Sequence, residues 1–198
     1  MAMQSSTLRP PTRRGRISWE QFIELPDDDR RELLDGRLVE MDVPTGLHEW
    51  IVSTLIGYLH VWAMSRKAGI VLASGYKVKI RRDRGFMPDV QYFRRGGRPV
   101  PDKGLDAGAP DLAVEVISPG SGRYDRVHKL RGYAEIGVPE YWLINPKRRT
   151  FERFVLAAPG HYGPPERFGG DDSFEPDTFS GLVIPLGELW QLPEWFTR

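Results

Sequence analysis

The sequence predicts an α/β domain built around a mixed β-sheet. A long helical pattern at residues 48–67 precedes strand patterns at 71–82, 86–93 and 111–118, and a further helix and further strands follow. The run at 111–118 is almost entirely apolar, which is typical of a strand buried on both faces of a sheet. No internal repeat or low-complexity linker interrupts the sequence, so a single domain is the simplest arrangement.

Composition excludes several classes of protein. The 198 residues include 28 basic and 27 acidic ones, and a formal net charge of +1 excludes a histone-like polycation or an acidic solvating tail. Hydrophobic residues make up 40% of the chain, and no apolar run approaches the roughly 18 residues of a membrane-spanning helix. The absence of cysteine excludes disulfides, a thiolate nucleophile and cysteine-ligated metals, and four scattered histidines do not suggest a zinc cluster. Carboxylates must therefore bind any metal.

Residues 1–16 are basic, with arginines, serines and prolines but no acid and little apolar periodicity. We expect a flexible, solvated tail there, and a basic arm that touches phosphates is the alternative. A secretory signal would need an apolar stretch at this end, so we expect a cytoplasmic protein with no membrane contact. Residues 17–198 then form the single domain.

The first elements of this domain are short. Ser18 is a suitable N-cap for a helix that stops near Pro26. Residues 28–34 form a second short turn, which ends at the hairpin-type turn Asp35-Gly36. A strand at 37–42 follows.

The elements after residue 47 are longer. Apolar residues recur every three to four positions in the helix at 48–67, and residues 71–82 alternate between basic and apolar side chains. Strands at 86–93 and 111–118 and a flexible loop at 119–122 come next. The remaining elements are a compact helix at 126–136, a strand pair at 140–145 and 150–156, and short strands within 174–189.

Two acids lie where a strand would favour apolar or neutral residues. Asp89 opens a strand directly after Pro88, and Glu115 interrupts the apolar run at 111–118. Because a buried, unpaired carboxylate costs several kcal/mol, we expect Glu115 to contact a metal, a cation or a hydrogen-bond donor. From this feature alone, Glu115 could belong either to a functional site or to a structural salt bridge.

Lys129 lies on the helix that follows Glu115. Placing Val127 on the core face of that helix puts Lys129 to one side, beside Tyr133, from where it could point along the sheet edge toward Glu115. An i,i+4 pair with Asp125, worth a few tenths of a kcal/mol, is the alternative.

Three further polar residues are candidates near the first turn. Glu32 lies near the end of a short helical turn and could project into a cleft, whereas alternation makes Glu40 an ordinary solvent-facing acid. His48 opens the long helix, so helix capping or a hydrogen bond in the core is its expected role.

Two carboxylates from neighbouring strands and a lysine suit the hydrolysis of phosphate esters. Mg²⁺ takes oxygen ligands and binds phosphate oxygens at its open positions, and a nearby lysine adds positive charge or orients water. Glycosidases also use two carboxylates, but they need no lysine. Basic runs that would suit a polyanionic partner, or form ordinary solvated faces, occur at 77–84, 94–98, 123–131 and 147–149.

The order of these motifs resembles the Uma branch of the PD-(D/E)XK (restriction-endonuclease-like) superfamily. The resemblance spans about residues 17 to 189 and is most specific from the Glu115 segment through Tyr141-Trp142. It rests on the segments Glu32–Val39, His48, Pro88–Val90, Pro110–Pro119, Asp125–Tyr133 and Gly137–Pro146.

This resemblance implies a mixed central sheet flanked by helices, with an extra N-terminal helix and strand and short C-terminal strands. It further implies that Asp89 and Glu115 bind Mg²⁺ or Mn²⁺, that Glu32 is the N-terminal acidic position, and that His48 and Glu40 are auxiliary candidates. The superfamily lysine would stand at residue 117, which is Ile117 here, and Lys129 is the stand-in.

The implied function is endonuclease activity on nucleic acid, expected to be DNA, and a homodimer is compatible with it. A catalytically silent nucleic-acid-binding or assembly module on the same fold is the alternative. A third hypothesis is a structural protein that dimerises through aromatic C-terminal residues, namely Phe174, Phe179, Trp190, Trp195 and Phe196.

Overall fold

A computed structural model describes residues 15–26 and 28–196. The predicted basic tail therefore lies, apart from Gly15 and Arg16, outside the described residues. Within the described ranges, no helix combines the length and the apolar character that crossing a membrane requires.

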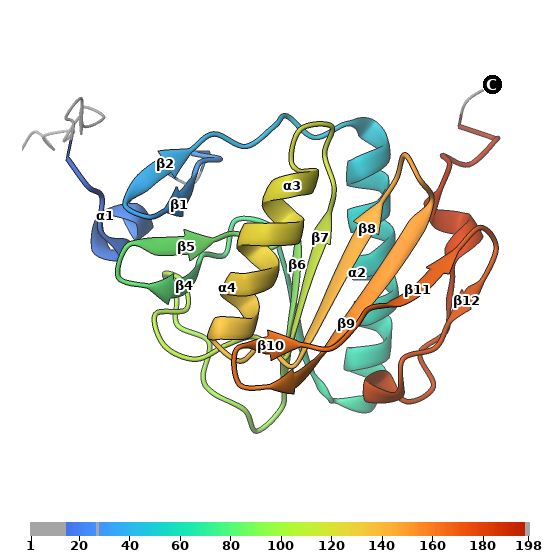
Figure 1. The fold of residues 1–198 in the computed structure, drawn as a ribbon. Coiled ribbons are helices and arrows are strands. Elements are labelled where there is room, and N and C mark those ends of the chain that lie inside the picture. Colours follow the sequence, from blue (N-terminus) through green and yellow to red (C-terminus); the bar gives the residue numbers. More distant parts are fainter. Residues whose placement is uncertain (1–14, 27, 197–198) are drawn as a thin grey trace, which may run out of the picture.

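A mixed β-sheet, here called the main sheet, forms the centre of the molecule (Figure 1). Strands β7 and β8 are parallel, whereas the other neighbouring strands in the described chain pair antiparallel. The spatial order is β10-β9-β8-β7-β6-β3, and β11 also pairs with β9. The strands are β3 (Gly69–Ala73), β6 (Val90–Arg94), β7 (Leu112–Val116), β8 (Glu140–Asn145), β9 (Thr150–Ala158), β10 (His161–Tyr162) and β11 (Glu166–Gly169).

Helices cover both faces of the main sheet, with α2 (Gly46–Arg66) behind it and a second helical segment in front (Figure 1). The second segment joins α3 (Gly122–Tyr124), a π-helical turn (Asp125–Lys129) and α4 (Leu130–Glu135). Side chains of β7 alternate between the two faces: Leu112 packs in the core beside α2, and Ala113 packs in the core beside α4. Glu115 shares the face of Ala113 and therefore points toward the second helical segment.

A second, antiparallel sheet, here called the small sheet, has the order β2-β1-β5-β4. Its core consists of Trp19 and Phe22, from helix α1, packed against Leu33. Asp35 and Gly36 both have positive φ angles, as the two-residue hairpin turn between β1 and β2 requires. The elements are α1 (Trp19–Ile23), β1 (Glu32–Leu34), β2 (Arg37–Val39), β4 (Val78–Arg81) and β5 (Arg84–Phe86).

Two predicted strands are each divided between the sheets. The prediction of one strand over 71–82 is wrong, because β3 belongs to the main sheet and β4 to the small sheet, with a turn at Gly75 between them. The predicted strand at 86–93 likewise ends at Phe86 and resumes at Val90. The prediction that 28–34 form only a turn is also wrong, since Glu32–Leu34 is strand β1.

The C-terminal segment packs on the α2 side of the main sheet. Phe174, Phe179 and Trp190 are buried in the same core as α2, so they stabilise the fold and are not free to form a dimer contact. Trp195 and Phe196 are exposed. The segment contains β12 (Ser173–Phe174), a 3-10 turn (Asp177–Phe179), β13 (Ile184–Pro185) and a second 3-10 turn (Leu186–Leu189).

Candidate active site

A cavity of about 390 Å³ lies between the small sheet, the first turn of α2 and the π-helical turn, at the end of β7. Its lining includes Glu32 from β1, His48 from α2, Glu115 from β7 and Lys129 from the π-helical turn, together with Asp89 just before β6. The structure thus brings five of the six predicted site residues to one cavity. The sixth, Glu40, is exposed and does not line it.

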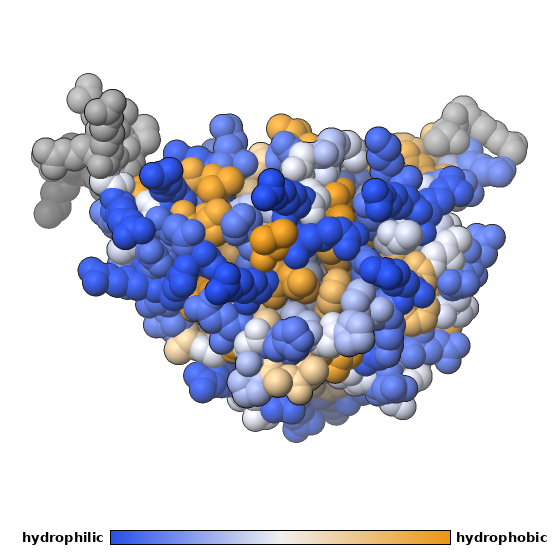
Figure 2. All heavy atoms as spheres, viewed as in Figure 1, coloured by the Kyte–Doolittle hydropathy of each residue, from blue (hydrophilic) through white to orange (hydrophobic). Residues whose placement is uncertain are grey.

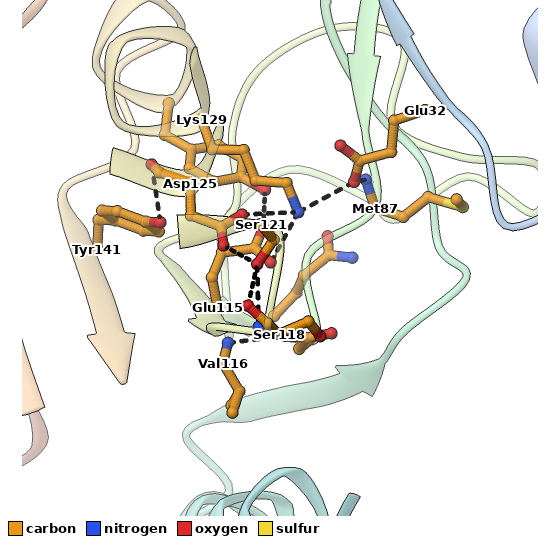
Figure 3. Close-up of polar contacts among 12 residues, drawn as sticks. Glu32, Met87, Glu115, Val116, Ser118, Ser121, Asp125, Lys129 and Tyr141 are labelled. Carbon is orange, nitrogen blue, oxygen red and sulfur yellow. Dashed lines mark hydrogen bonds and ion pairs between the residues drawn. The ribbon is translucent and has the colours of Figure 1, made fainter. Parts of the chain in front are cut away.

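Lys129 lies at the centre of a buried charge cluster. Its Nζ atom is 2.8 Å from Oε2 of Glu115, 3.1 Å from Oε1 of Glu32 and 3.8 Å from Oδ1 of Asp125. Figure 3 shows Glu32 on one side of the Lys129 amine and Asp125 and Glu115 on the other. Both sequence hypotheses for Lys129 therefore describe real contacts, and the one with Glu115 is shorter.

The π-helical turn determines where Lys129 points. The prediction that Val127 faces the core is wrong, because its side chain is 51% exposed while Asp125 and Lys129 are buried. A π-helical turn holds an extra residue, so the side chains before it are rotated relative to a regular α-helix. Asp125, Lys129 and Tyr133, spaced four residues apart, lie together on the face toward Glu115.

Burial and neighbouring charges control the protonation of this cluster. Burial raises the pKa of Glu115 well above its ordinary value, against the opposing effect of the Lys129 ammonium. For Lys129, burial favours the neutral amine, but Glu115, Glu32 and Asp125 outweigh it and raise its pKa well above the ordinary value. Lys129 is therefore a cation at neutral pH.

Hydrogen bonds fix the two carboxylates beside Lys129. The Tyr133 hydroxyl donates to Oε1 of Glu115 at 2.6 Å, and the backbone N–H of Met87 donates to Oε1 of Glu32 at 2.8 Å. The other Glu32 oxygen, Oε2, is buried and has no hydrogen-bond partner among the described residues. Because buried polar atoms are normally satisfied, Oε2 is a candidate ligand for a water or a cation, although the Glu32 carboxylate also interacts with the Tyr124 hydroxyl and raises its pKa.

Asp89 is held at the end of β7 through a single oxygen. Its Oδ2 atom accepts a hydrogen bond from the backbone N–H of Val116 at 2.8 Å and lies 3.3 Å from Nε2 of His48. Burial disfavours the charged form of His48, but Asp89 outweighs it and raises the His48 pKa above its ordinary value. His48 thus contacts Asp89 in the cavity, and the helix cap is Thr45, whose Oγ1 accepts from the His48 N–H.

A family model described as "Uma2: Putative restriction endonuclease" matches residues 19–187. The chain belongs to the Uma2 family. The family resemblance inferred from the sequence is therefore confirmed. Comparison with curated proteins finds no match.

A solved structure with the fold of this Uma2 chain is described as a "putative nuclease belonging to DUF820" from Anabaena variabilis ATCC 29413. The two chains are 20% identical and superpose with a TM-score of 0.72, over 88% of this chain and 97% of the other. The likeness confirms the predicted fold class, a mixed central sheet flanked by helices.

The donor set of this Uma2 site suits a small divalent cation. Mg²⁺ is usually held by one or two carboxylates and keeps waters or phosphate oxygens at its other positions. Asp89 and Glu115 supply two carboxylates to one cavity, and Glu32 adds an unsatisfied oxygen. In the described part of the chain, no group of three or more His, Cys, Asp or Glu is placed to hold a metal ion.

Several basic residues of the predicted runs form ion pairs within the fold. Arg81 and Arg84 contact Asp35 at 2.8 and 2.6 Å, and Arg126 contacts the buried Glu152. On the face that carries α4, hydrophilic side chains are interspersed with hydrophobic ones (Figure 2). The runs at 77–84 and 123–131 are therefore, at these residues, parts of structural ion pairs.

Asp125, expected from the sequence only as an alternative partner of Lys129, lines the cavity. Burial raises the pKa of Asp125 from 3.8 to about 6, against the opposing effects of Lys129 and of a hydrogen bond from Ser121. The spacing of Asp125, Lys129 and Tyr133, four residues apart on one helix, is the signal that could have identified it.

Replacing Asp125 by asparagine is expected to change the pH dependence of stability. The folded protein binds more protons than the unfolded chain between about pH 4 and pH 6, so its free energy of unfolding falls as the pH rises through that range. Asp125→Asn lacks this titration. Its free energy of unfolding, relative to that of the wild type, should therefore rise by about 3 kcal/mol between about pH 4 and pH 6. Urea unfolding at a series of pH values measures the difference, and a constant difference contradicts the assignment.

Proposed function

We propose that this chain is a metal-dependent endonuclease that hydrolyses phosphodiester bonds of nucleic acid, with DNA as the expected substrate. Membership of the Uma2 family supports a nuclease-like function. The observation that carries the proposal is the Lys129 ammonium held between Glu115 and Glu32 in the cavity that Asp89 also lines.

Asp89 and Glu115 would hold Mg²⁺ or Mn²⁺, and Glu32 would complete the acidic pocket. Such an ion, when bound, polarises a phosphoryl oxygen and lowers the pKa of a bound water. The chain's own part is to fix the two carboxylates before substrate arrives. The Val116 N–H and His48 hold Asp89, and Tyr133 holds Glu115.

Lys129 would supply a fixed positive charge next to the reacting phosphate. Charge that is already oriented in a buried site stabilises the negative charge of the transition state without reorganisation. Ile117 cannot do this, because its side chain is an uncharged hydrocarbon, partly buried against the hydrophobic core beside α4. The π-helical turn instead brings a lysine to the same carboxylate from the helix.

Cleavage assays of labelled oligonucleotides with Mn²⁺ test the proposal. We expect the wild type to cut and Asp89→Asn to lose activity by about 10³-fold, because several kcal/mol of transition-state stabilisation depend on the ion. Asp106→Asn, an exposed aspartate outside the cavity, is the matched control and should cut like the wild type. Equal cutting by all three proteins would refute the assignment.

A catalytically silent nucleic-acid-binding module is the second candidate. Ile117 at the usual lysine position favours it, and so does the neutralisation of Lys129 by surrounding carboxylates. Salt-dependent binding without a cleavage product would support this candidate over the enzyme. A homodimer remains a proposal, and sedimentation at several concentrations tests it.

A further inference from the structure

The segment 40–45, here called the strap, connects β2 to α2 without regular secondary structure. It passes above the end of β7 (Figure 1), and three of its residues, Met41, Asp42 and Pro44, line the cavity. Oδ2 of Asp42 accepts a hydrogen bond of 2.6 Å from the backbone N–H of Gly120, in the loop that follows β7. The strap and this loop are thus joined across one side of the cavity.

The contact between strap and loop leaves no room for a Cβ atom at residue 120 unless the Asp42 side chain moves. A Cβ atom at Gly120 would lie 2.6 Å from Oδ2 of Asp42, which is shorter than any normal contact. Only glycine permits this approach without a shift of the Asp42 side chain. The link therefore holds the strap and the loop after β7 together beside the cavity.

The proposed reactive groups lie deep below this opening. The side chains of Lys129, Glu115 and Glu32 are 3%, 3% and 1% exposed, and that of Asp89 is 17% exposed. A phosphodiester must therefore enter the cavity to reach them. At about 390 Å³ the cavity is at the small end of the range of about 300–1,000 Å³ that accepts small ligands, too small for stacked base pairs.

Charge around the cavity also disfavours a duplex. Among the described lining residues, acids outnumber bases: Asp28, Asp42 and Glu49 are exposed there, whereas Arg30 is the exposed base. A duplex brings the phosphates of two strands toward these carboxylates, whereas a single strand brings those of one. The carboxylates therefore repel a duplex more strongly. Apolar side chains that could contact a base or sugar complete the lining, namely Met41, Pro44, Val52 and Met87.

We propose that the cavity takes a single nucleic-acid strand, as found in an overhang, a flap or an unpaired region, and excludes an intact duplex. The depth of the charged groups and the acidic lining favour one unstacked strand, and the strap borders the cavity that this strand would enter. Cleavage of such a strand rests on the proposed nuclease function. Preferential binding of a single strand rests on the cavity alone.

Binding of one labelled sequence in three forms tests the proposal: single-stranded, fully paired, and paired with a single-stranded overhang. With Ca²⁺ in place of Mn²⁺, fluorescence anisotropy should give about tenfold or tighter binding of the single strand and the overhang than of the blunt duplex. With Mn²⁺, cuts should fall within the unpaired residues. Equal or tighter binding of the blunt duplex would overturn the proposal.

The cleavage arm separates the two proposals. Duplex cutting as fast as single-strand cutting, abolished in Glu115→Gln, would refute the single-strand preference and leave the nuclease function standing. Single-strand binding without any cutting would refute the nuclease function and support the strand preference. Failure to bind any of the three oligonucleotides would refute both.

Variants of the strap test its part in this selection. Asp42→Ala removes the link to Gly120 and should reduce the preference for single strands severalfold, whereas Asp42→Asn keeps an acceptor oxygen and should retain most of it. Val43→Ala alters the adjacent strap residue, which is 81% exposed and does not line the cavity, and should leave the preference unchanged. An unchanged preference in Asp42→Ala, with thermal unfolding like the wild type, would overturn the role of the strap.

Discussion

Replacing Lys129 by methionine is expected to destabilise the fold and to abolish cleavage together. The ammonium contacts Glu115, Glu32 and Asp125, and all four side chains are buried. Removing one partner from a buried charge cluster costs about 3–5 kcal/mol, because the remaining charges lose their compensation. Loss of the fixed positive charge should lower the cleavage rate by about 10²- to 10³-fold.

The pH dependence of this variant distinguishes lost charge compensation from lost packing. Without Lys129, which lowers the pKa values of Glu115 and Asp125, both carboxyls should bind protons at still higher pH in the folded state. A carboxyl whose pKa is raised in the folded state stabilises the protein at low pH. This stabilisation is lost as the pH rises through the raised pKa. The deficit in unfolding free energy should therefore be smaller at about pH 5 than at about pH 8.

Urea unfolding of Lys129→Met at the two pH values gives the measurement. Lys103→Met is the matched control, because Lys103 pairs with Glu24 on the surface and the change should cost at most about 1 kcal/mol. A deficit that does not change with pH would mean that Lys129 matters by packing alone.

The sequence predicts the elements whose patterns are set by local burial. The apolar run of β7, the periodicity of α2 and the strand pair β8–β9 are found within a few residues of the predicted bounds. Alternation within 71–82 does not reveal that β3 and β4 belong to different sheets. That division depends on pairing with distant strands, which the local pattern does not encode.

The candidate site was predictable to a similar extent. An acid within an apolar strand identifies Glu115, but apolar periodicity placed Val127 on the core face, whereas the π-helical turn there buries Asp125 and Lys129. Glu32 reaches the cavity from a strand, not from the predicted turn. The link from Asp42 to Gly120 joins residues 78 apart through a backbone N–H, so side-chain patterns give no signal for it.

Replacing Glu115 by glutamine should abolish cleavage without weakening the fold. Burial and the nearby carboxylates Asp89, Asp125 and Glu32 already oppose the ionised form of Glu115. The neutral amide removes one buried negative charge, keeps an oxygen for the Tyr133 hydroxyl, and leaves Lys129 with Glu32 and Asp125. The free energy of unfolding should stay within about 1 kcal/mol of the wild type or rise, since net hydrogen-bond terms are of that size.

Thermal unfolding with and without Mn²⁺ shows whether the lost carboxylate binds the ion. An ion present at about 100 times its dissociation constant stabilises the folded wild type by about 2.7 kcal/mol, and Glu115→Gln should lose most of this gain. Cleavage should fall by about 10³-fold. An undiminished response to Mn²⁺ would remove Glu115 from the metal site.

Lys129→Met and Glu115→Gln together separate a catalytic cluster from a structural ion pair. An ion pair that only held the fold would lose stability from either change, since each removes one partner of the same 2.8 Å contact. In a site where carboxylates outnumber the single ammonium, removing the cation should destabilise the protein and removing one carboxylate should not. A large loss of stability in Lys129→Met but none in Glu115→Gln, with cleavage lost in both, is therefore expected of a cavity that is short of positive charge until a divalent cation binds.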